Sequence, residues 1–146
     1  MKRYWYKFRV KYGKAFDTGK NKNVSEEYLV DAESFTETEK RATKAATELI
    51  GTRDFDITAI SREPITEILK EDENEGNHWY KTVVSLVTED EDTGVKKFSP
   101  QTIYVNAPST KEADRMLRQH MSSSVTEWEI KSIAETKVLG VLGYKQ

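Results

Sequence analysis

Trp5-Tyr6-Lys7 returns as Trp79-Tyr80-Lys81 after 74 positions, and this repeated triplet decides how the whole chain is interpreted. Three further motifs recur in the same order at nearly the same offset. They are Asp17-Thr18-Gly19 with Asp92-Thr93-Gly94, Ser34-x-x-Glu37 with Ser109-x-x-Glu112, and Ile57-x-x-Ile60 with Ile130-x-x-Ile133. The offset drifts only between motifs, as expected when loops change length and packed elements do not. The sequence therefore predicts a tandem duplication.

Each copy has the pattern of two strands, a helix and a third strand. Tyr6 and Phe8 alternate with charged residues over 3–12, which predicts a strand with one apolar and one basic face. The Ser-x-x-Glu motif is a capping box for a helix that ends near Gly51, a typical C-cap residue. In this helix we expect a buried stripe of Thr38, Ala42, Ala45 and Leu49. The remaining expected elements are strands over 24–32, 55–60, 79–88, 97–107 and 126–136, and a second helix over 109–121.

Two irregularities are also predicted. In the third strand of each copy the apolar spacing changes from two to three, near Thr58-Ala59 and at the equivalent place before Ile133, which indicates a β-bulge. Short strands over 65–69, after Pro64, and over 138–142 are expected to pair with each other at a sheet edge.

The predicted fold class is α+β, with a ββαβ(β) unit present twice. The first repeat covers residues 1–70, an acidic linker covers 71–77, and the second repeat covers 78–146. We expect two halves related by a pseudo-twofold axis, each with an antiparallel or mixed sheet and one helix, packed together as one compact unit. The helical crossover makes the second and third strands of each copy parallel to each other.

Composition restricts the class of protein. The 23 basic and 25 acidic residues give a formal charge of −2, which argues against a strongly basic nucleic-acid architecture. The chain has no Cys, so disulfides, thiolate ligands and cysteine nucleophiles are excluded. No apolar run approaches the roughly 18 residues of a membrane span, and the N-terminus lacks the apolar region of a signal peptide. We expect a soluble, cytoplasmic protein without membrane contact.

No motif has the pattern of a catalytic or metal site. Paired Asp-Thr-Gly triplets also occur in aspartic proteases, but here the flanks are polar, so each triplet is interpreted as a hairpin turn. His78 and His120 have no partner at a ligand-like spacing, and His120, at a helix C-terminus, is expected to be structural. Phosphate loops and dinucleotide fingerprints are absent from the sequence. We therefore expect no enzymatic activity, no cofactor and no metal.

The charged face of the first strand is the candidate site. Its residues, with lysines of the following loop, would present cations and one aromatic ring to an anionic partner such as nucleic acid. They are Arg3, Trp5, Lys7, Arg9, Lys11, Lys14, Lys20 and Lys22. The competing interpretation is a solvated surface, in which Trp5 and Trp79 are matched packing residues.

A family resemblance rests on motifs spread over nearly the whole chain. They are Trp5-Tyr6-Lys7 with Val10-Lys11-Tyr12, the segments 27–32 and 34–37, Trp79-Tyr80-Lys81, and residues 130–135. With these motifs the sequence resembles domain-of-unknown-function family 4494, uncharacterised proteins of Bacteroidetes and their phages and mobile elements. The family has no established activity. The resemblance implies only a setting, that of a small intracellular protein of a phage or mobile element.

The leading hypothesis is a non-enzymatic binding module for single-stranded or otherwise accessible nucleic acid. The alternative is a protein-interaction or inhibitor module, in which a dipolar surface or the aromatic residues Trp79 and Tyr104 dock on a host or phage protein. An enzyme is the third hypothesis, and a cleft lined by paired polar groups would favour it.

Overall fold

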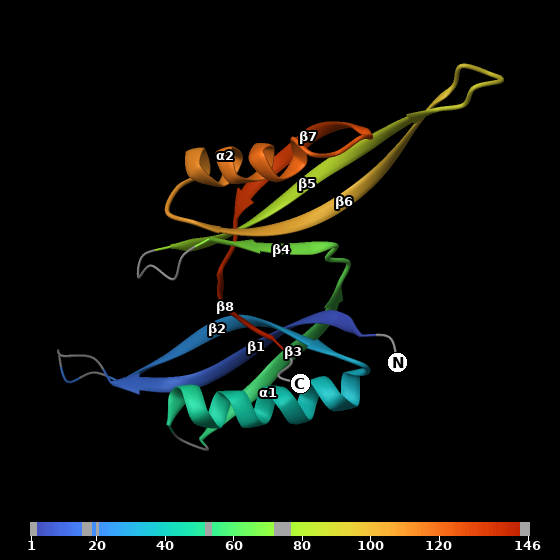
Figure 1. Cartoon of the computed structure of the whole chain (residues 1–146). Coiled ribbons are helices and arrows are strands. Elements are labelled where there is room, and N and C mark those ends of the chain that lie inside the picture. Colours follow the sequence, from blue (N-terminus) through green and yellow to red (C-terminus); the bar gives the residue numbers. More distant parts are fainter. Residues whose placement is uncertain (1–2, 16–18, 20, 52–53, 72–76, 144–146) are drawn as a thin grey trace. The chain divides into compact units, whose positions relative to one another are not determined.

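The computed structural model describes residues 3–15, 19, 21–51, 54–71 and 77–143. Within these residues the chain forms two helices and two four-stranded mixed sheets, so the α+β class is confirmed (Figure 1). The elements are β1 (Tyr4–Ala15), β2 (Asn21–Ala32), α1 (Phe35–Ile50), β3 (Phe55–Glu63), β4 (Glu67–Lys70), β5 (His78–Glu89), β6 (Lys96–Ala107), α2 (Thr110–Met121), β7 (Glu127–Glu135) and β8 (Val138–Leu142).

The chain divides into two compact units, Met1–Pro64 with Lys137–Gln146, and Ile65–Thr136. The sheet of the first unit has the strand order β3-β1-β2-β8, and that of the second has β4-β6-β5-β7. In each sheet a long antiparallel hairpin is central and the third strand of the repeat pairs antiparallel with its first strand. The second and third strands of each repeat are therefore parallel to each other, as predicted.

The short strands β4 and β8 do not pair with each other, so that prediction was wrong. β4 pairs in parallel with β6, with Glu67 opposite Ile103, whereas β8 pairs in parallel with β2. The last strand of each predicted repeat thus lies in the sheet of the other unit. The two units therefore divide the chain after Pro64 and after Thr136, whereas the predicted repeats were 1–70 and 78–146. Segments this short have too little alternation to specify a partner strand, which is selected by the free edge beside β2 or β6.

Both helices begin as the capping motif predicts. The Ser34 hydroxyl accepts a hydrogen bond from the Glu37 N–H at 3.1 Å, and the Ser109 hydroxyl accepts one from the Glu112 N–H at 3.2 Å. α1 ends at Gly51, whose φ of 76° lies in the left-handed region that favours glycine. The local sequence therefore determines where the helices start, and for α1 also where it ends.

Both predicted bulges are present. In the first sheet Arg9 is opposite Ala59 while the next residue, Val10, is opposite Ile57, which leaves Thr58 as the extra residue of β3. In the second sheet the same shift between Val83 and Val84 leaves Lys131 as the extra residue of β7. One inserted residue explains why the apolar spacing changes from two to three, because the alternation restarts after it.

The core of each unit lies between its sheet and its helix. In the first unit Tyr6, Phe8 and Val30 of the sheet pack with Ala42 of α1. The helix buries Thr38, Ala42 and Ala46, whereas Leu49 of the predicted stripe is 53 % exposed. Ala46 is buried where the pattern predicted Ala45, which is half-buried, so the predicted stripe was correct for Thr38 and Ala42 and wrong for its last two residues.

The core of the second unit uses larger helical residues. Met116, Leu117 and Met121 of α2 pack against Tyr80 and Val84 of β5. Half-buried side chains of β7, including that of Trp128, close one side of this core.

Candidate functional site

The basic residues at odd positions of β1 lie on the face of the sheet opposite α1. Side chains alternate along a strand, and the even positions Tyr6 and Phe8 are buried in the core with α1. The odd positions therefore point to the other face, where Lys7 is half-buried and Arg9 and Lys11 are exposed. The predicted alternation of an apolar and a basic face is confirmed.

Neighbouring strands supply carboxylates to these cations. Arg9 is directly opposite Glu27 on β2, and its Nη2 lies 3.0 Å from Glu27 Oε1. The Nζ of Lys7 lies 3.4 Å from Oε1 of Glu63, at the end of β3. The middle of the strand is therefore a row of ion pairs within the sheet, and its charge is largely compensated.

Arg3 and Trp5, at the start of the strand, have different surroundings. Nη1 of Arg3 lies 3.6 Å from Oε1 of Glu37, in the first turn of α1, and Nη2 lies 4.0 Å from Oε1 of Glu33. Trp5 is half-buried and lies opposite Asp31 on β2. Arg3 therefore connects the start of β1 to the start of α1, which is a role in the fold.

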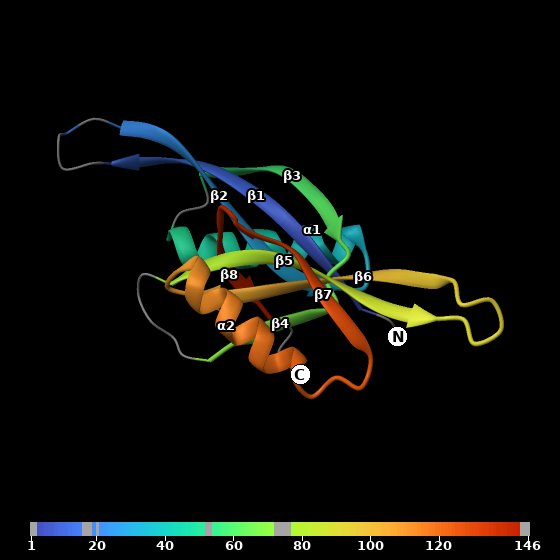
Figure 2. The same cartoon turned by 90° about the horizontal axis from the view of Figure 1, so that it is seen from above.

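The outer end of the β1–β2 hairpin has uncompensated charge. This part of the hairpin extends past the end of α1 (Figures 1 and 2). Lys14 and Lys22 are both exposed and directly opposite each other, and among the described residues neither has an ion-pair partner. Lys11, on the other face, lies between Ser25 and Asp56 in the register. Lys20 lies outside the described residues.

Tyr12 shares the face of Lys14 and Lys22, and the sequence pattern assigned it to the core. It is half-buried, whereas Val10, two positions earlier on the same face, is fully buried, so the coverage of this face decreases at Tyr12. Its pKa is raised by partial burial and by the Glu26 carboxylate, which accepts a hydrogen bond from its hydroxyl. The sequence pattern missed Tyr12 as a candidate surface residue. Its position near the end of the strand is the feature that could have indicated partial exposure.

Glu26 also contacts Tyr28, whose ring stacks on Phe8 at 5.6 Å between centroids. The Tyr28 hydroxyl lies 3.4 Å from Glu26 Oε1, to which it donates. Burial, followed by the charge of Glu26, raises the pKa of Tyr28 to about 12. Both tyrosines are therefore neutral at physiological pH, and Glu26 is the acceptor between them.

The hairpin of the second unit has the opposite charge at its tip. Glu89 is opposite Lys96, and Asp90 Oδ1 accepts hydrogen bonds from the N–H groups of Asp92 and Thr93 at 2.8 and 3.0 Å. These two bonds lower the pKa of Asp90. Gly94 has a φ of 70°, so the turn interpretation of this triplet is confirmed, although Asp90 and not Asp92 makes the bonds. In the first triplet Gly19 has a φ of 78°, and Asp17 and Thr18 lie outside the described residues.

The histidines contact glutamates of neighbouring elements. His78 Nδ1 lies 3.1 Å from Glu135 Oε1, and His120 Nε2 contacts Glu67 of β4. His120 therefore connects the last turn of α2 to the edge strand. In the described part of the chain no three or more His, Asp or Glu residues are grouped to hold a metal ion.

The tryptophan and tyrosine assigned to a docking surface have little exposed area. Trp79 is 5 % exposed and Tyr104 is 2 % exposed. The carbonyl of Trp79 accepts hydrogen bonds from the N–H and the hydroxyl of Thr136 at 2.9 and 2.8 Å.

Over the ranges that the structure describes, neither helix is long and apolar enough to cross a membrane.

The model of the family "Domain of unknown function (DUF4494)" matches residues 4–144. No curated protein and no solved structure matches the chain.

Proposed function

The chain belongs to the DUF4494 family of domains of unknown function, and from this premise we propose a function on the basis of its own surface. The protein is a non-enzymatic binding module for single-stranded or otherwise accessible nucleic acid. Its contact surface is the outer end of the β1–β2 hairpin, with Lys14, Lys22 and Tyr12 on one face and Lys11 on the other. Lys20, which lies between β1 and β2 in the sequence, belongs to the same proposal.

One observation carries this proposal, the cross-strand pair of Lys14 and Lys22. Like charges directly opposite each other destabilise a hairpin, so an anion that binds both lysines would remove a repulsion present in the free protein. At the equivalent position of the second sheet Thr88 is opposite Lys97, and its hydroxyl is 3.5 Å from the Lys97 carbonyl oxygen, to which it donates. The fold itself therefore does not require two lysines here.

The ligand class follows from what surrounds the lysines. Two ammonium groups neutralise phosphates and release counterions, while Tyr12 offers a ring on which an unpaired base can stack. Arg3, Lys7 and Arg9 form ion pairs within the first unit and are assigned to the fold. The proposed contact surface is thus smaller than the full set of basic residues that the sequence suggested.

A fluorescence-anisotropy titration with a labelled oligothymidylate tests the proposal. We expect binding at low salt with a Kd below about 10 μM, and a loss of affinity with added salt that follows counterion release. The double variant Lys14→Glu, Lys22→Glu should weaken binding at least about tenfold, because each reversed charge repels phosphate. The matched control is Lys44→Glu, an exposed lysine of α1, which should bind as the unchanged protein does. Absence of binding at low salt, or equal losses in both variants, would overturn the proposal.

The proposal also covers the origin and setting of the chain. A tandem duplication is supported by the shared strand order of the two sheets, by the two serine caps and by the two bulges at equivalent positions. A cytoplasmic protein of Bacteroidetes, or of their phages and mobile elements, is the setting that the family resemblance implies. Sequencing the genes that flank the coding sequence in its source genome checks this setting.

Protein binding is the second candidate function. An open groove beside the edge strand β3 favours it.

A further inference from the structure

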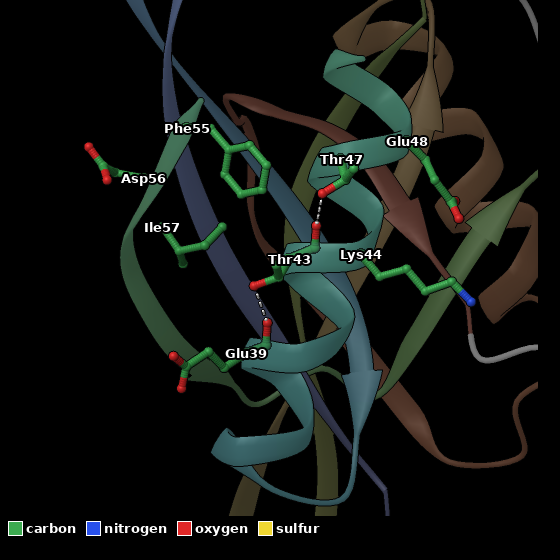
Figure 3. Close-up of a pocket in the computed structure, with 8 residues that line it drawn as sticks. All are labelled: Glu39, Thr43, Lys44, Thr47, Glu48, Phe55, Asp56 and Ile57. Atoms are coloured by element: carbon green, nitrogen blue, oxygen red, sulfur yellow. Dashed lines mark hydrogen bonds between the residues drawn. The ribbon is translucent and has the colours of Figure 1, made fainter. Parts of the chain in front are cut away.

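A groove of about 670 Å³ lies on the first unit between α1 and β3. Figure 3 shows Phe55 and Ile57 of β3 pointing toward Thr43 and Thr47 of the helix across this groove. Both β3 residues are half-buried, so the floor of the groove is apolar and open to solvent. In the second unit the equivalent of Phe55 is Trp128, which packs against the core and fills more of the corresponding space.

The two threonines on the helical side of the groove use their hydroxyls within the helix. The Thr43 hydroxyl donates to the Glu39 carbonyl at 2.9 Å, and the Thr47 hydroxyl donates to the Thr43 carbonyl at 2.8 Å (Figure 3). With their hydroxyls directed to the helix backbone, the threonines present methyl groups to an occupant. The groove therefore suits an apolar side chain.

The strand side of the groove is a sheet edge. β3 is the terminal strand of its sheet and, among the strands that the structure describes, pairs only with β1. A terminal strand presents a row of N–H and C=O groups that an extended segment can pair with. A segment added there would place every second side chain on the α1 side, against Phe55 and Ile57.

The charges around the groove indicate which side chains such a segment would carry at its remaining positions. The groove residues include three carboxylates, of Glu39, Glu48 and Asp56, and one ammonium, of Lys44. Asp56 points away from α1 (Figure 3) and is opposite Lys11 of β1 in the register, so the edge strand itself presents a carboxylate on this face. An occupant that alternates apolar and basic residues places its basic side chains beside Asp56, and its positive charge complements the net negative charge of the groove residues.

We propose that the first unit binds an extended peptide segment of a partner protein, with alternating apolar and basic residues, as an added strand on β3. The apolar residues enter the groove between β3 and α1, and the basic residues lie beside Asp56. This site is separate from the hairpin lysines, and its occupant is a cationic peptide instead of a polyanion.

Anisotropy titration of the full chain with a labelled peptide of alternating valine and lysine tests the proposal. We expect saturable binding, and ¹H–¹⁵N spectra in which the amides of Phe55 to Ile57 shift. Two comparison peptides separate the contribution of charge from that of backbone pairing. A valine–glutamate peptide tests charge, and the valine–lysine peptide with N-methyl groups on every second amide tests backbone pairing. Both should bind at least about tenfold more weakly, because one is repelled and the other cannot pair with an edge.

Three variants complete the test. Thr47→Arg fills the groove and adds a cation, so the valine–lysine peptide should lose at least about tenfold in affinity; arginine also favours the helix more than threonine does. Thr36→Arg makes the same change at an exposed position of α1, and Glu91→Lys removes a carboxylate from the second hairpin; both should bind normally. Equal binding of the two charge types, normal binding by Thr47→Arg, or no binding would overturn the proposal. Peptide binding should also be unchanged in the double variant Lys14→Glu, Lys22→Glu. The peptide site and the nucleic-acid surface are therefore tested independently of each other.

Discussion

The two sheets share one strand order, but at one pair of core positions they divide large and small side chains in opposite ways. In the first unit aromatic residues of the sheet, Tyr6 and Phe8, pack against the small Ala42 of α1. In the second unit Phe8 has Thr82 as its equivalent and Ala42 has Leu117, so the larger residue comes from the helix. A core needs a constant total volume and not a constant residue at each position, because its packing density is close to that of a crystal.

The two hairpins also differ in the charges that they place opposite each other. The outer end of β1–β2 has Lys14 opposite Lys22, whereas the tip of β5–β6 has Glu89 opposite Lys96. The first hairpin places like charges opposite each other, and the second places opposite charges there. These charges lie outside the core, and they distinguish the two units as surfaces.

The largest effect should come from the helical side of the second core. Leu117→Ala removes a fully buried side chain from α2, and we expect a loss of about 2–5 kcal/mol in the free energy of unfolding. Urea denaturation followed by circular dichroism measures it. Leu49→Ala, the same change at a 53 % exposed position of α1, should stay within about 0.5 kcal/mol. Similar losses for both variants would contradict the assignment of the core.

A smaller effect is expected when the first core is given the helix residue of the second. Ala42→Leu adds volume where Phe8 already fills the space, and should cost about 1–3 kcal/mol in urea denaturation. Adding Phe8→Val, which removes volume from the sheet, should recover part of this loss, with a coupling of at least about 0.5 kcal/mol. Strict additivity of the two changes would show that the two residues do not share one space.

The dependence of stability on alkaline pH should distinguish the two sheets further. The folded pKa of Tyr28 is about 12 against an ordinary value of 10.0, so the folded protein retains this proton where the unfolded chain has lost it. The stability that depends on the neutral tyrosine is therefore full below pH 10 and lost as pH rises toward 12. In Tyr28→Phe the slope of stability against pH in this window should be shallower. The equivalent residue of the second sheet is Ile103, which does not titrate, so Ile103→Val should leave the slope unchanged.

The smallest effect on stability concerns the hairpin lysines. Lys22→Glu turns the repulsive pair with Lys14 into an attractive one, and should stabilise the protein by about 0.2–1 kcal/mol in thermal denaturation. The same variant should bind oligothymidylate more weakly. A variant that is both less stable and unchanged in binding would show that the two lysines do not interact and do not contact the ligand.

Local patterns predicted most of the elements correctly. The alternation around Tyr6 and Phe8 identified β1, the two Ser-x-x-Glu motifs identified the helix starts, and the spacing of Ile57 and Ile60 identified a bulge. The candidate site was predicted less well, because the carboxylates of Glu27 and Glu63 reach Arg9 and Lys7 from other strands. Strand alternation determines the face of a side chain, whereas a charge partner depends on register with a distant segment.

By itself, the amino-acid sequence determined the order of strands and helices, their caps, the bulges and the apolar face of each sheet, since these depend on residues a few positions apart. Only the tertiary structure decided that β4 joins the sheet of β6 and that β8 joins the sheet of β2. It also decided which lysines keep an uncompensated charge and that a groove opens beside Phe55. These features depend on long-range pairing, where the choice of partner is a difference in free energy between whole arrangements of the chain.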